Sequence, residues 1–355
     1  MTKCTISYTT TDGVSERATI ENGSIDLRKK SIETINLTGF EGCDALKRLK
    51  LDGNKLTKIN LEPLSTCPNL RVLDISKNSF TELDISPLEK CEELEKLNIG
   101  TNIIEEINLS VLENCENLRS LRLFNNKLRE INLEALSNCS HLTRLELANN
   151  LLGSLDLSPL DNCEEIEQLN VMYNELRHLD LSPLSAAKGL RFLYLHHNYL
   201  ESLDLSPLRN CPELHILRLG GNELQEIDLA PLSKSKNLVR IGIAMNNLRE
   251  IDLTPLAECS ALYSLDISRN KLTEIDLEPL SNCKNLEELY IYSHHEQEEN
   301  RFEEIDLTPL FECPELIDMI LPEKAELVAD KEYKDHEDIP TAMDRLKEDA
   351  RITWI

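Results

Sequence analysis

The chain has 355 residues, 41% of them hydrophobic and only 4% aromatic, so its core is predicted to be aliphatic. Its formal net charge of −26 disfavours nucleic acid and anionic membranes as partners, because both attract positive surfaces. Residues 1–10 contain no apolar run behind a basic start, and no stretch approaches roughly eighteen consecutive apolar residues, so we predict an acidic cytoplasmic protein without a membrane span.

The first 24 residues predict a β-hairpin. Residues 4–10 and 14–20 alternate in polarity and are rich in β-branched side chains, and the turn signal Asp12-Gly13 lies between them. We expect this hairpin to cover the first turn of a repeat that begins near residue 25, because a terminal repeat otherwise exposes half of its core.

From residue 25 the sequence repeats itself every 24 residues. One phrase, Leu262-Tyr-Ser-Leu265-Asp-Ile267-Ser-Arg-Asn270, recurs along the chain with its asparagine in register. The residues at the second and third apolar positions are two apart, so both point to one face of a short strand. The asparagine follows the strand, where its amide can pair with backbone groups left open by the bend. We predict a stacked hydrogen-bonded ladder of Asn54, Asn78, Asn102, Asn126, Asn150, Asn174, Asn198, Asn222, Asn246 and Asn270.

The second half of each repeat predicts a short helix or 3₁₀ turn. In Ser158-Pro159-Leu160 the serine offers an N-cap and the proline suits the first helical position. A cysteine column follows this turn, with Ala187 and Ser235 in its two gaps, as packing of a small side chain predicts. We expect buried, reduced thiols, because the total of eleven cysteines is odd and no CxxC pair exists for zinc. The column comprises Cys43, Cys67, Cys91, Cys115, Cys139, Cys163, Cys211, Cys259, Cys283 and Cys313.

The C-terminal part departs from the pattern. Ser293-His294 replaces the asparagine register, and residues 294–302 contain a six-residue insertion. One more partial repeat runs to Leu321. Residues 322–355 are predicted to form a cap, with a helix that starts at Pro340 and places Met343, Leu346 and Ala350 on one stripe, followed by a short strand through Ile352 and Trp354.

The phrase LxxLxLxxN resembles the signature of leucine-rich repeats, and the resemblance covers residues 25–321. The tail I-D-L-S-P-L-x-x-C is similar to repeat arrays from archaeal genomes. This resemblance implies an α/β solenoid of one domain, a curved horseshoe of about twelve turns. Its parallel sheet is expected on the concave side and its short helical or 3₁₀ turns on the convex side, between the hairpin cap at 1–24 and the helical cap at 322–355.

Outward positions around the strands carry the most informative side chains. Much of the chain's aromatic content falls there, and Lys and Arg outnumber Asp and Glu although the net charge is −26. Tyr, Arg and Met concentrate binding energy at interfaces, although Tyr and Arg also suit any exposed sheet. The smaller residues Gly220, Gly221, Gly242 and Ala244 predict a smooth hollow beside them. We predict a concave binding face of Arg122, Phe124, Arg144, Met172, Tyr173, Arg191, Phe192, Tyr194, His196, His197, Ile216, Arg218, Arg240, Met245, Tyr263, Tyr290 and Tyr292.

An acidic stripe is predicted on one flank, where an Asp or Asn column follows a Glu column. Examples are Asp228 and Asp252 beside Glu226 and Glu250. Oxygen ligands suit divalent cations. We favour turn capping and solubility over a cation site, because Asn alternates with Asp in the column. The predicted cofactor and metal content is therefore none.

No motif predicts catalysis. The chain lacks GxGxxG, GxxxxGK[ST], HExxH and GxSxG, and the histidine pairs His196-His197 and His294-His295 are expected about 20 Å apart. We predict a non-enzymatic scaffold that binds a partner protein, which is the role that the family resemblance implies. An alternative of another class is a regulator of an enzyme, such as a GTPase activator or a phosphatase regulatory subunit.

Overall fold

The computed structural model describes residues 4–293 and 300–355. Its contacts divide the chain into two compact units, Met1–Glu175 and Leu176–Ile355. The boundary falls inside the repeat array and not at a cap, because each turn of a solenoid packs mainly against its neighbours and the array has no single centre. Within the described residues, no helix combines the length and the apolar character needed to cross a membrane.

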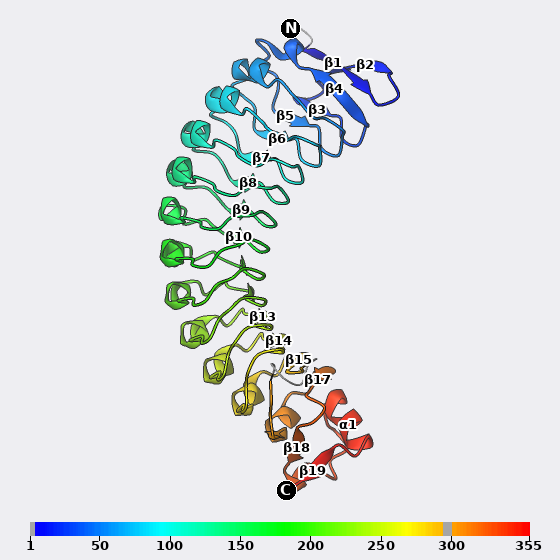
Figure 1. Ribbon diagram of the computed structural model, residues 1–355, viewed down its shortest axis with the longest axis vertical. Coiled ribbons are helices and arrows are strands. Elements are labelled where there is room, and N and C mark those ends of the chain that lie inside the picture. The colour runs from blue at the N-terminus through cyan, green and yellow to red at the C-terminus, as the bar shows by residue number, and fades with distance from the viewer. Residues whose placement is uncertain (1–3, 294–299) are drawn as a thin grey trace. The chain divides into compact units, whose positions relative to one another are not determined.

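The first unit contains an antiparallel sheet and a parallel one (Figure 1). The predicted hairpin is formed by β1 (Thr5–Thr10) and β2 (Ser15–Thr19), and β4 (Ile32–Asn36) pairs with the other edge of β1. The parallel sheet has one strand from each turn, and the central residue of each strand, a leucine or in β3 an isoleucine, is buried. Its strands are β3 (Ser24–Asp26), β5 (Arg48–Lys50), β6 (Val72–Asp74), β7 (Lys96–Asn98), β8 (Ser120–Arg122), β9 (Arg144–Glu146) and β10 (Gln168–Asn170).

The second unit continues the same repeat and ends in the C-terminal cap. Its parallel strands from successive turns are β11 (Phe192–Tyr194), β12 (Ile216–Arg218), β13 (Arg240–Gly242), β14 (Ser264–Asp266), β15 (Glu288–Tyr290) and β17 (Asp318–Ile320). The cap is built on a small parallel sheet of β16 (Glu304–Asp306), β18 (Glu326–Ala329) and β19 (Ile352–Trp354), with helix α1 (Thr341–Glu348) between the last two strands in the chain. Met343 is fully buried, whereas Ala350 follows the helix and is exposed, so the predicted stripe is shorter than expected.

Every turn of the array contains a 3₁₀ turn, and the alternation of strand and turn agrees with a leucine-rich-repeat fold. The turns lie at Thr38–Phe40, Glu62–Thr66, Ser86–Lys90, Ser110–Asn114, Glu134–Asn138 and Ser158–Leu160 in the first unit. In the second they lie at Ser182–Ala186, Ser206–Asn210, Ala230–Lys234, Thr254–Glu258, Glu278–Asn282 and Thr308–Glu312; one more, Lys331–Tyr333, belongs to the cap.

The predicted N-cap by serine is wrong. Leu157 is the N-cap of the turn at Ser158, and no side chain of that residue caps it. The free amide of Ser158 instead donates to Asp156 Oδ1 at 2.8 Å. An Asp or Asn two residues before the amide that it accepts makes this bond in each of the remaining repeats as well, from Asn36 to Asp306. The Asp/Asn column therefore has a structural role, which explains why the two residue types alternate in it.

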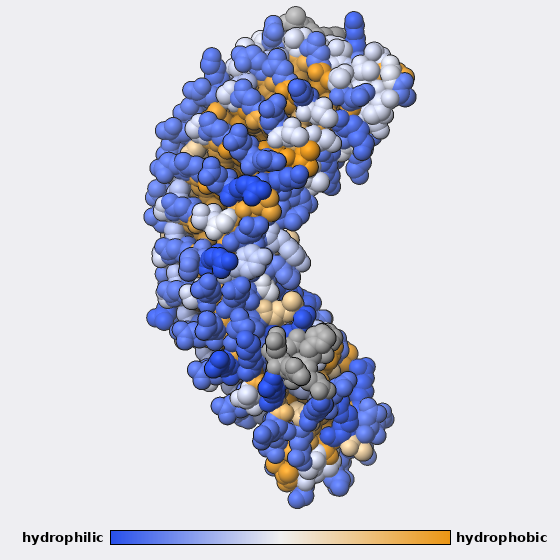
Figure 2. Space-filling model, in the orientation of Figure 1, coloured by the Kyte–Doolittle hydropathy of each residue, from blue (hydrophilic) through white to orange (hydrophobic). Residues whose placement is uncertain are grey.

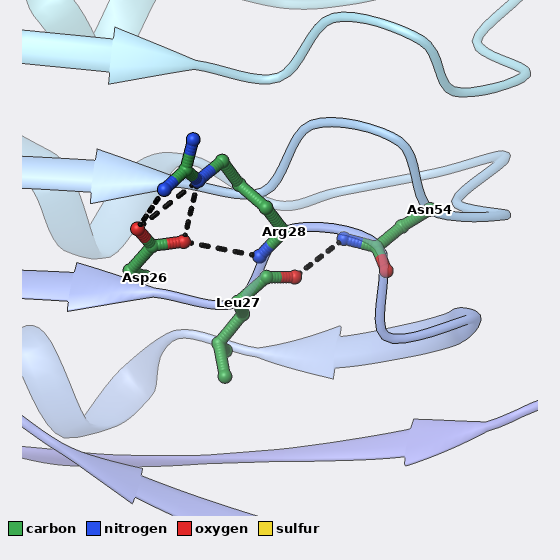
Figure 3. Close-up of polar contacts among 4 residues, drawn as sticks. All are labelled: Asp26, Leu27, Arg28 and Asn54. Carbon is green, nitrogen blue, oxygen red and sulfur yellow. Dashed lines mark hydrogen bonds and ion pairs between the residues drawn. The ribbon is translucent and has the colours of Figure 1, made fainter.

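The asparagines form a ladder of hydrogen bonds. Asn54 Nδ2 donates to Leu27 O at 2.9 Å (Figure 3). It also donates to Leu51 O at 2.7 Å, so it joins one turn to the turn before it. Its Oδ1 accepts from the backbone amides of Lys30 and Ile32. Each later ladder asparagine in the described chain repeats a version of this pattern and lies largely inside the protein.

The ladder continues past the insertion through Asn300, which sequence analysis missed. Asn300 Nδ2 donates to Ile267 O and Ile291 O, and its Oδ1 accepts from the amide of Leu272. Ser293 supports it by donating from its hydroxyl to Asn300 O at 3.0 Å. The predicted replacement of the asparagine register by Ser293-His294 is therefore wrong at this position, and His294 lies outside the described residues.

One cysteine prediction is also wrong. Cys43, expected to be reduced, forms a disulfide with Cys4, the one cysteine outside the column. Cys43 is the first member of the column and has no earlier turn to pack against, so it meets the N-terminal hairpin instead. The nine other cysteines are free and buried, as predicted. Burial raises the pKa of the Cys91 thiol to about 12, which suppresses the reactive thiolate.

Thiol titration distinguishes the two classes of cysteine. Under non-reducing conditions we expect very slow alkylation of the folded protein and alkylation of nine of the eleven cysteines after denaturation. Mass spectrometry of a digest should find Cys4 and Cys43 in one linked peptide. Eleven alkylated cysteines would contradict the disulfide, and rapid labelling of the native protein would contradict the burial of the column.

Candidate functional site

The outward positions of each strand form the surface that we call the strand face of a unit. In β11 the side chain of Leu193 is buried, whereas Phe192 and Tyr194 on either side of it are half-buried and face outward. The parallel register places Phe192 beside Ile216 and Tyr194 beside Arg218. Side chains at equivalent positions of successive turns therefore lie next to one another, and each strand face is a set of such columns.

A cluster of aromatic rings lies on the strand face of the second unit. Phe192 and Tyr194 lie nearly parallel, with ring centroids 6.4 Å apart, and His215 flanks Phe192 at 6.2 Å. His196 contacts Tyr194 edge to face, and His197 follows it at 5.5 Å. The structure thus brings together four predicted site residues and adds His215, which the prediction did not include. The rings form a half-buried, relatively rigid surface.

The charge around this ring cluster is positive. Burial, together with the positive charges of His197 and Arg218, lowers the pKa of His196 to about 4, so His196 is neutral at neutral pH. Neither Arg191 nor Arg218 forms an ion pair with another residue that the structure describes. Arg218, beside Tyr194 in the register, and Arg191, next to Phe192 in the chain, are therefore two cations without an ion pair among the described residues, on a chain whose net charge is −26.

The predicted smooth hollow at the glycines is filled by neighbouring side chains. A Cβ added to Gly242 would lie 2.8 Å from Arg218 Nη1, and one added to Gly221 would lie 2.6 Å from His197 Nδ1. The missing side chains thus let Arg218 and His197 lie flat against the next turn. The glycines position these two site residues and do not leave a cavity.

Beyond β12 the same face is largely neutralised. Arg240 pairs with Glu288 at 2.9 Å and lies over the ring of Tyr263, 4.7 Å from its centroid. Tyr290 donates its hydroxyl to Asp318 at 2.6 Å. The predicted residues Arg240, Tyr263 and Tyr290 are therefore committed to contacts within the protein, and Tyr292 lies half-buried at the end of this part of the face.

The first unit holds the other predicted site residues. Arg122 and Arg144 both approach Glu146, at 3.5 and 3.7 Å. The ring of Phe124 lies against Gly100, where a Cβ would come within 2.6 Å of it. Met172 is half-buried, and Tyr173 is 48% exposed. These residues belong to the strand face of the first unit, and we consider them apart from the ring cluster of the second.

Sequence analysis also missed a backbone feature of the strand face. The residue before most ladder asparagines has a positive φ. At the non-glycine residues in this position, from Asn125 to Arg269, φ lies between 53° and 58°. Gly53 and Gly221 occupy the same position, where glycine and asparagine carry little steric penalty. Tyr173 and Met245 adopt it despite their size and are 48% and 39% exposed. The position has this conformation in most repeats whichever residue occupies it, so the surrounding turn imposes it.

Nothing among the described residues forms a metal centre. No group of three or more His, Cys, Asp or Glu in the described ranges is arranged to hold a metal ion. The Asp column, considered as a source of ligands, is engaged in capping the 3₁₀ turns. Its hydrogen bonds, of which the bond from Ser182 to Asp180 is an example, lower the pKa of the Asp180 carboxyl.

Comparison with known proteins identifies the repeat. The model of the BspA-type leucine-rich repeat region matches residues 19–143, 86–182, 113–228 and 186–308, together more than half of the chain. The chain belongs to the BspA-type leucine-rich repeat family. No curated protein matches this BspA-type chain. Leucine-rich-repeat proteins are typically interaction scaffolds, and this coarse role applies to the chain.

Solved structures share the fold of this BspA-type protein. The internalin InlF of Listeria monocytogenes is 25% identical with a TM-score of 0.64, and the match covers 86% of this chain and 90% of that one. The functional domain of InlJ from the same species, which includes a cysteine ladder, is 23% identical with a TM-score of 0.61 over 86% and 67% of the two chains. The plant peptide hormone receptor RGFR1 in complex with RGF2 is 24% identical with a TM-score of 0.70, over 86% of this chain and 51% of the receptor chain.

Proposed function

We propose that the protein is a non-enzymatic scaffold that binds a partner protein through the strand face of its second unit. The observation that carries the proposal is the guanidinium group of Arg218, which lies beside Tyr194 in the register of β11 and β12. Arg191, next to Phe192 in the chain, is a second cation without an ion pair among the described residues. Burying an unpaired cation is costly, whereas an acidic group of a partner would compensate it. A partner with an acidic or mixed-charge surface fits this part of the face.

The neighbouring side chains support an interface of this kind. Ile216 lies beside Phe192 in the register and is half-buried, and Met245 projects from a strained backbone position nearby. Together they give apolar contact around the charged groups, which is the usual arrangement of a binding hot spot. Arg240 and Tyr263 form the far border, where the internal ion pair with Glu288 leaves less charge for a partner.

The test is a double substitution, Tyr194→Ala with Arg218→Ala. Both side chains face outward, so the variant should fold normally. Affinity capture from the native cell and mass spectrometry would identify the partner, and calorimetry with the purified partner would then compare the variants. We expect the double variant to weaken binding at least about thirtyfold, because truncation of a central Tyr or Arg costs about 2 kcal/mol or more.

The matched control changes charge on the flank of the same unit. Glu250→Gln with Glu274→Gln should leave the affinity nearly intact and alter only its salt dependence, because exposed charges contribute little when screened. If the flank variant abolished binding while the strand-face variant retained it, the proposed site would be wrong and the acidic flank would take its place.

The disulfide between Cys4 and Cys43 disfavours the predicted cytoplasmic location. That prediction assumed reduced thiols throughout, whereas Cys4 and Cys43 are joined. Disulfides persist in oxidising compartments and are rare in the cytosol. We therefore propose that the scaffold works where this bond can form, and the thiol titration applied to protein from its native source tests it.

A further inference from the structure

An apolar groove runs along the flank of the first unit, on a surface that the proposed function does not use. Its floor consists of one half-buried aliphatic side chain from each of four successive turns, namely Ile59, Leu83, Ile107 and Ile131. The groove has a volume of about 890 Å³. Figure 2 shows apolar atoms exposed between hydrophilic ones over the turns of this unit. Four branched side chains in a row leave apolar area open to water, which favours an occupant.

The two walls of the groove differ in what remains available for binding. On one side, Asp84 and Asn108 already accept the amides of the following 3₁₀ turns. On the other side, Glu82, Glu106 and Glu130 are exposed and form no ion pair with any residue that the structure describes. Lys58 is the one cation among the described residues that line the groove. The groove therefore combines an apolar floor with a row of free carboxylates.

This combination excludes several occupants. A second copy of the chain, at a net charge of −26, would bring like charge to an acidic wall. An anionic lipid surface would be repelled for the same reason. A basic segment of another protein, with apolar side chains on one stripe, satisfies both the floor and the wall.

The spacing of the floor selects the conformation of that segment. Successive parallel strands lie about 4.8 Å apart, so the floor offers one apolar side chain about every 4.8 Å. A helix presents one apolar side chain per turn of about 5.4 Å, whereas alternate residues of an extended strand are about 6.7 Å apart. Over the three intervals between Ile59 and Ile131, a helix drifts by about 1.8 Å and a strand by nearly 6 Å. A helix of about ten residues spans this length.

We propose that this groove binds a basic amphipathic helix of a partner protein, which inserts its apolar stripe between the Glu wall and the capped turns. Leu83 and Ile107 form the middle of the floor and receive the central apolar side chains. Glu82, Glu106 and Glu130 pair with lysine or arginine on the adjoining face of the helix.

The test uses a synthetic peptide of leucine and lysine, about fourteen residues long, with leucine at i, i+3, i+4 and i+7. Calorimetry should show binding to the full chain. Leu83→Lys with Ile107→Lys should weaken it at least about tenfold, because the floor then carries charge where the apolar stripe docks. All variants are made in a background of Ile227→Lys with Ile251→Lys, because these residues line an equivalent groove of the second unit that would otherwise bind the same peptide. The matched control adds Val14→Lys with Ile317→Lys, two exposed apolar residues that do not line the groove. This control should retain the affinity.

The remaining outcomes separate the proposal from nonspecific attraction. Equal loss in both lysine variants, or loss in neither, would overturn the assignment to this groove. A peptide with glutamate in place of lysine should not bind, and binding by it would contradict the proposed role of charge. A peptide of the same leucine and lysine composition with strictly alternating residues should bind at least tenfold more weakly, and equal binding would contradict the helical conformation.

A second variant changes the Glu wall, because a lysine in the floor could perturb folding. It combines Glu82→Gln, Glu106→Gln and Glu130→Gln, all at exposed residues. It should bind the lysine peptide more weakly and with less dependence on salt, and unchanged binding would contradict the proposal.

Discussion

Replacing Asn174 by leucine is expected to lower the free energy of unfolding by about 3 kcal/mol or more, because three buried backbone groups lose their partners at about 1–3 kcal/mol each. Asn174 Nδ2 donates to Leu147 O at 3.1 Å and to Val171 O at 3.0 Å, and its Oδ1 accepts from the amide of Leu152 at 3.1 Å. Leucine fills a similar volume but offers neither donor nor acceptor. The decrease in the free energy of unfolding therefore measures what the hydrogen bonds of Asn174 contribute to stability, apart from its packing.

Two measurements check this expectation. Thermal unfolding should begin at a lower temperature, and hydrogen exchange of the Leu152 amide should accelerate more than that of amides several turns away, because a solenoid opens locally. Asn162→Leu is the control, since Asn162 is exposed and lies in the same repeat outside the ladder. An unchanged melting curve with normal protection at Leu152 would show that the ladder contributes little.

The regular part of the fold was predictable because each repeat supplies the same local signals many times. The interval of 24 placed the ladder from Asn54 to Asn270, and the apolar spacing placed the strands and their buried faces. The continuation at Asn300 was predictable in principle. Asn300 precedes Asp306 by six residues, just as Asn270 precedes Asp276, so counting back from the cap column would have found it.

Features that depend on a single contact could not be derived from the periodicity. The disulfide joins the first residue of the column to Cys4, 39 residues earlier in the chain, and no repeated pattern indicates that pairing. The positive φ before the ladder asparagines was hidden because Tyr173 and Met245 occupy a position where glycine would have revealed it. Their conformation is determined by the surrounding turn and not by their own preference.

The candidate site also combines features that the repeat predicts with features that depend on single contacts. Alternation along a strand correctly placed Tyr194 and Arg218 on the outer face. It could not show which charges remain available, because Arg240 pairs with Glu288 two repeats away while Arg218 extends over Gly242. Charge compensation across turns depends on side-chain geometry. The proposed binding site is therefore smaller than the face predicted from sequence and comprises the part of the second unit around β11 and β12.

Replacing Gly39 by alanine is expected to separate the N-terminal hairpin from the first turn. A Cβ at Gly39 would lie 1.7 Å from Thr5 O and 2.7 Å from Thr5 C, so it would overlap backbone that no change of rotamer can move. Phe40, the next residue, is fully buried, which prevents the 3₁₀ turn from shifting outward. We expect a destabilisation of at least about 3 kcal/mol, the upper end for overpacking, with loss of hydrogen-exchange protection in β1 and β2.

Gly153→Ala is the matched control, because a Cβ at Gly153 would meet no atom within 4 Å and its backbone lies outside the left-handed region. That variant should unfold within about 0.5 kcal/mol of the parent protein. The hairpin also remains tethered through Cys4 and Cys43, so the Gly39 variant should lose far more protection after reduction than before it. If Gly39→Ala melted like the parent protein under both conditions, the close packing of β1 on the first turn would be wrong, and with it the account of how the array is capped.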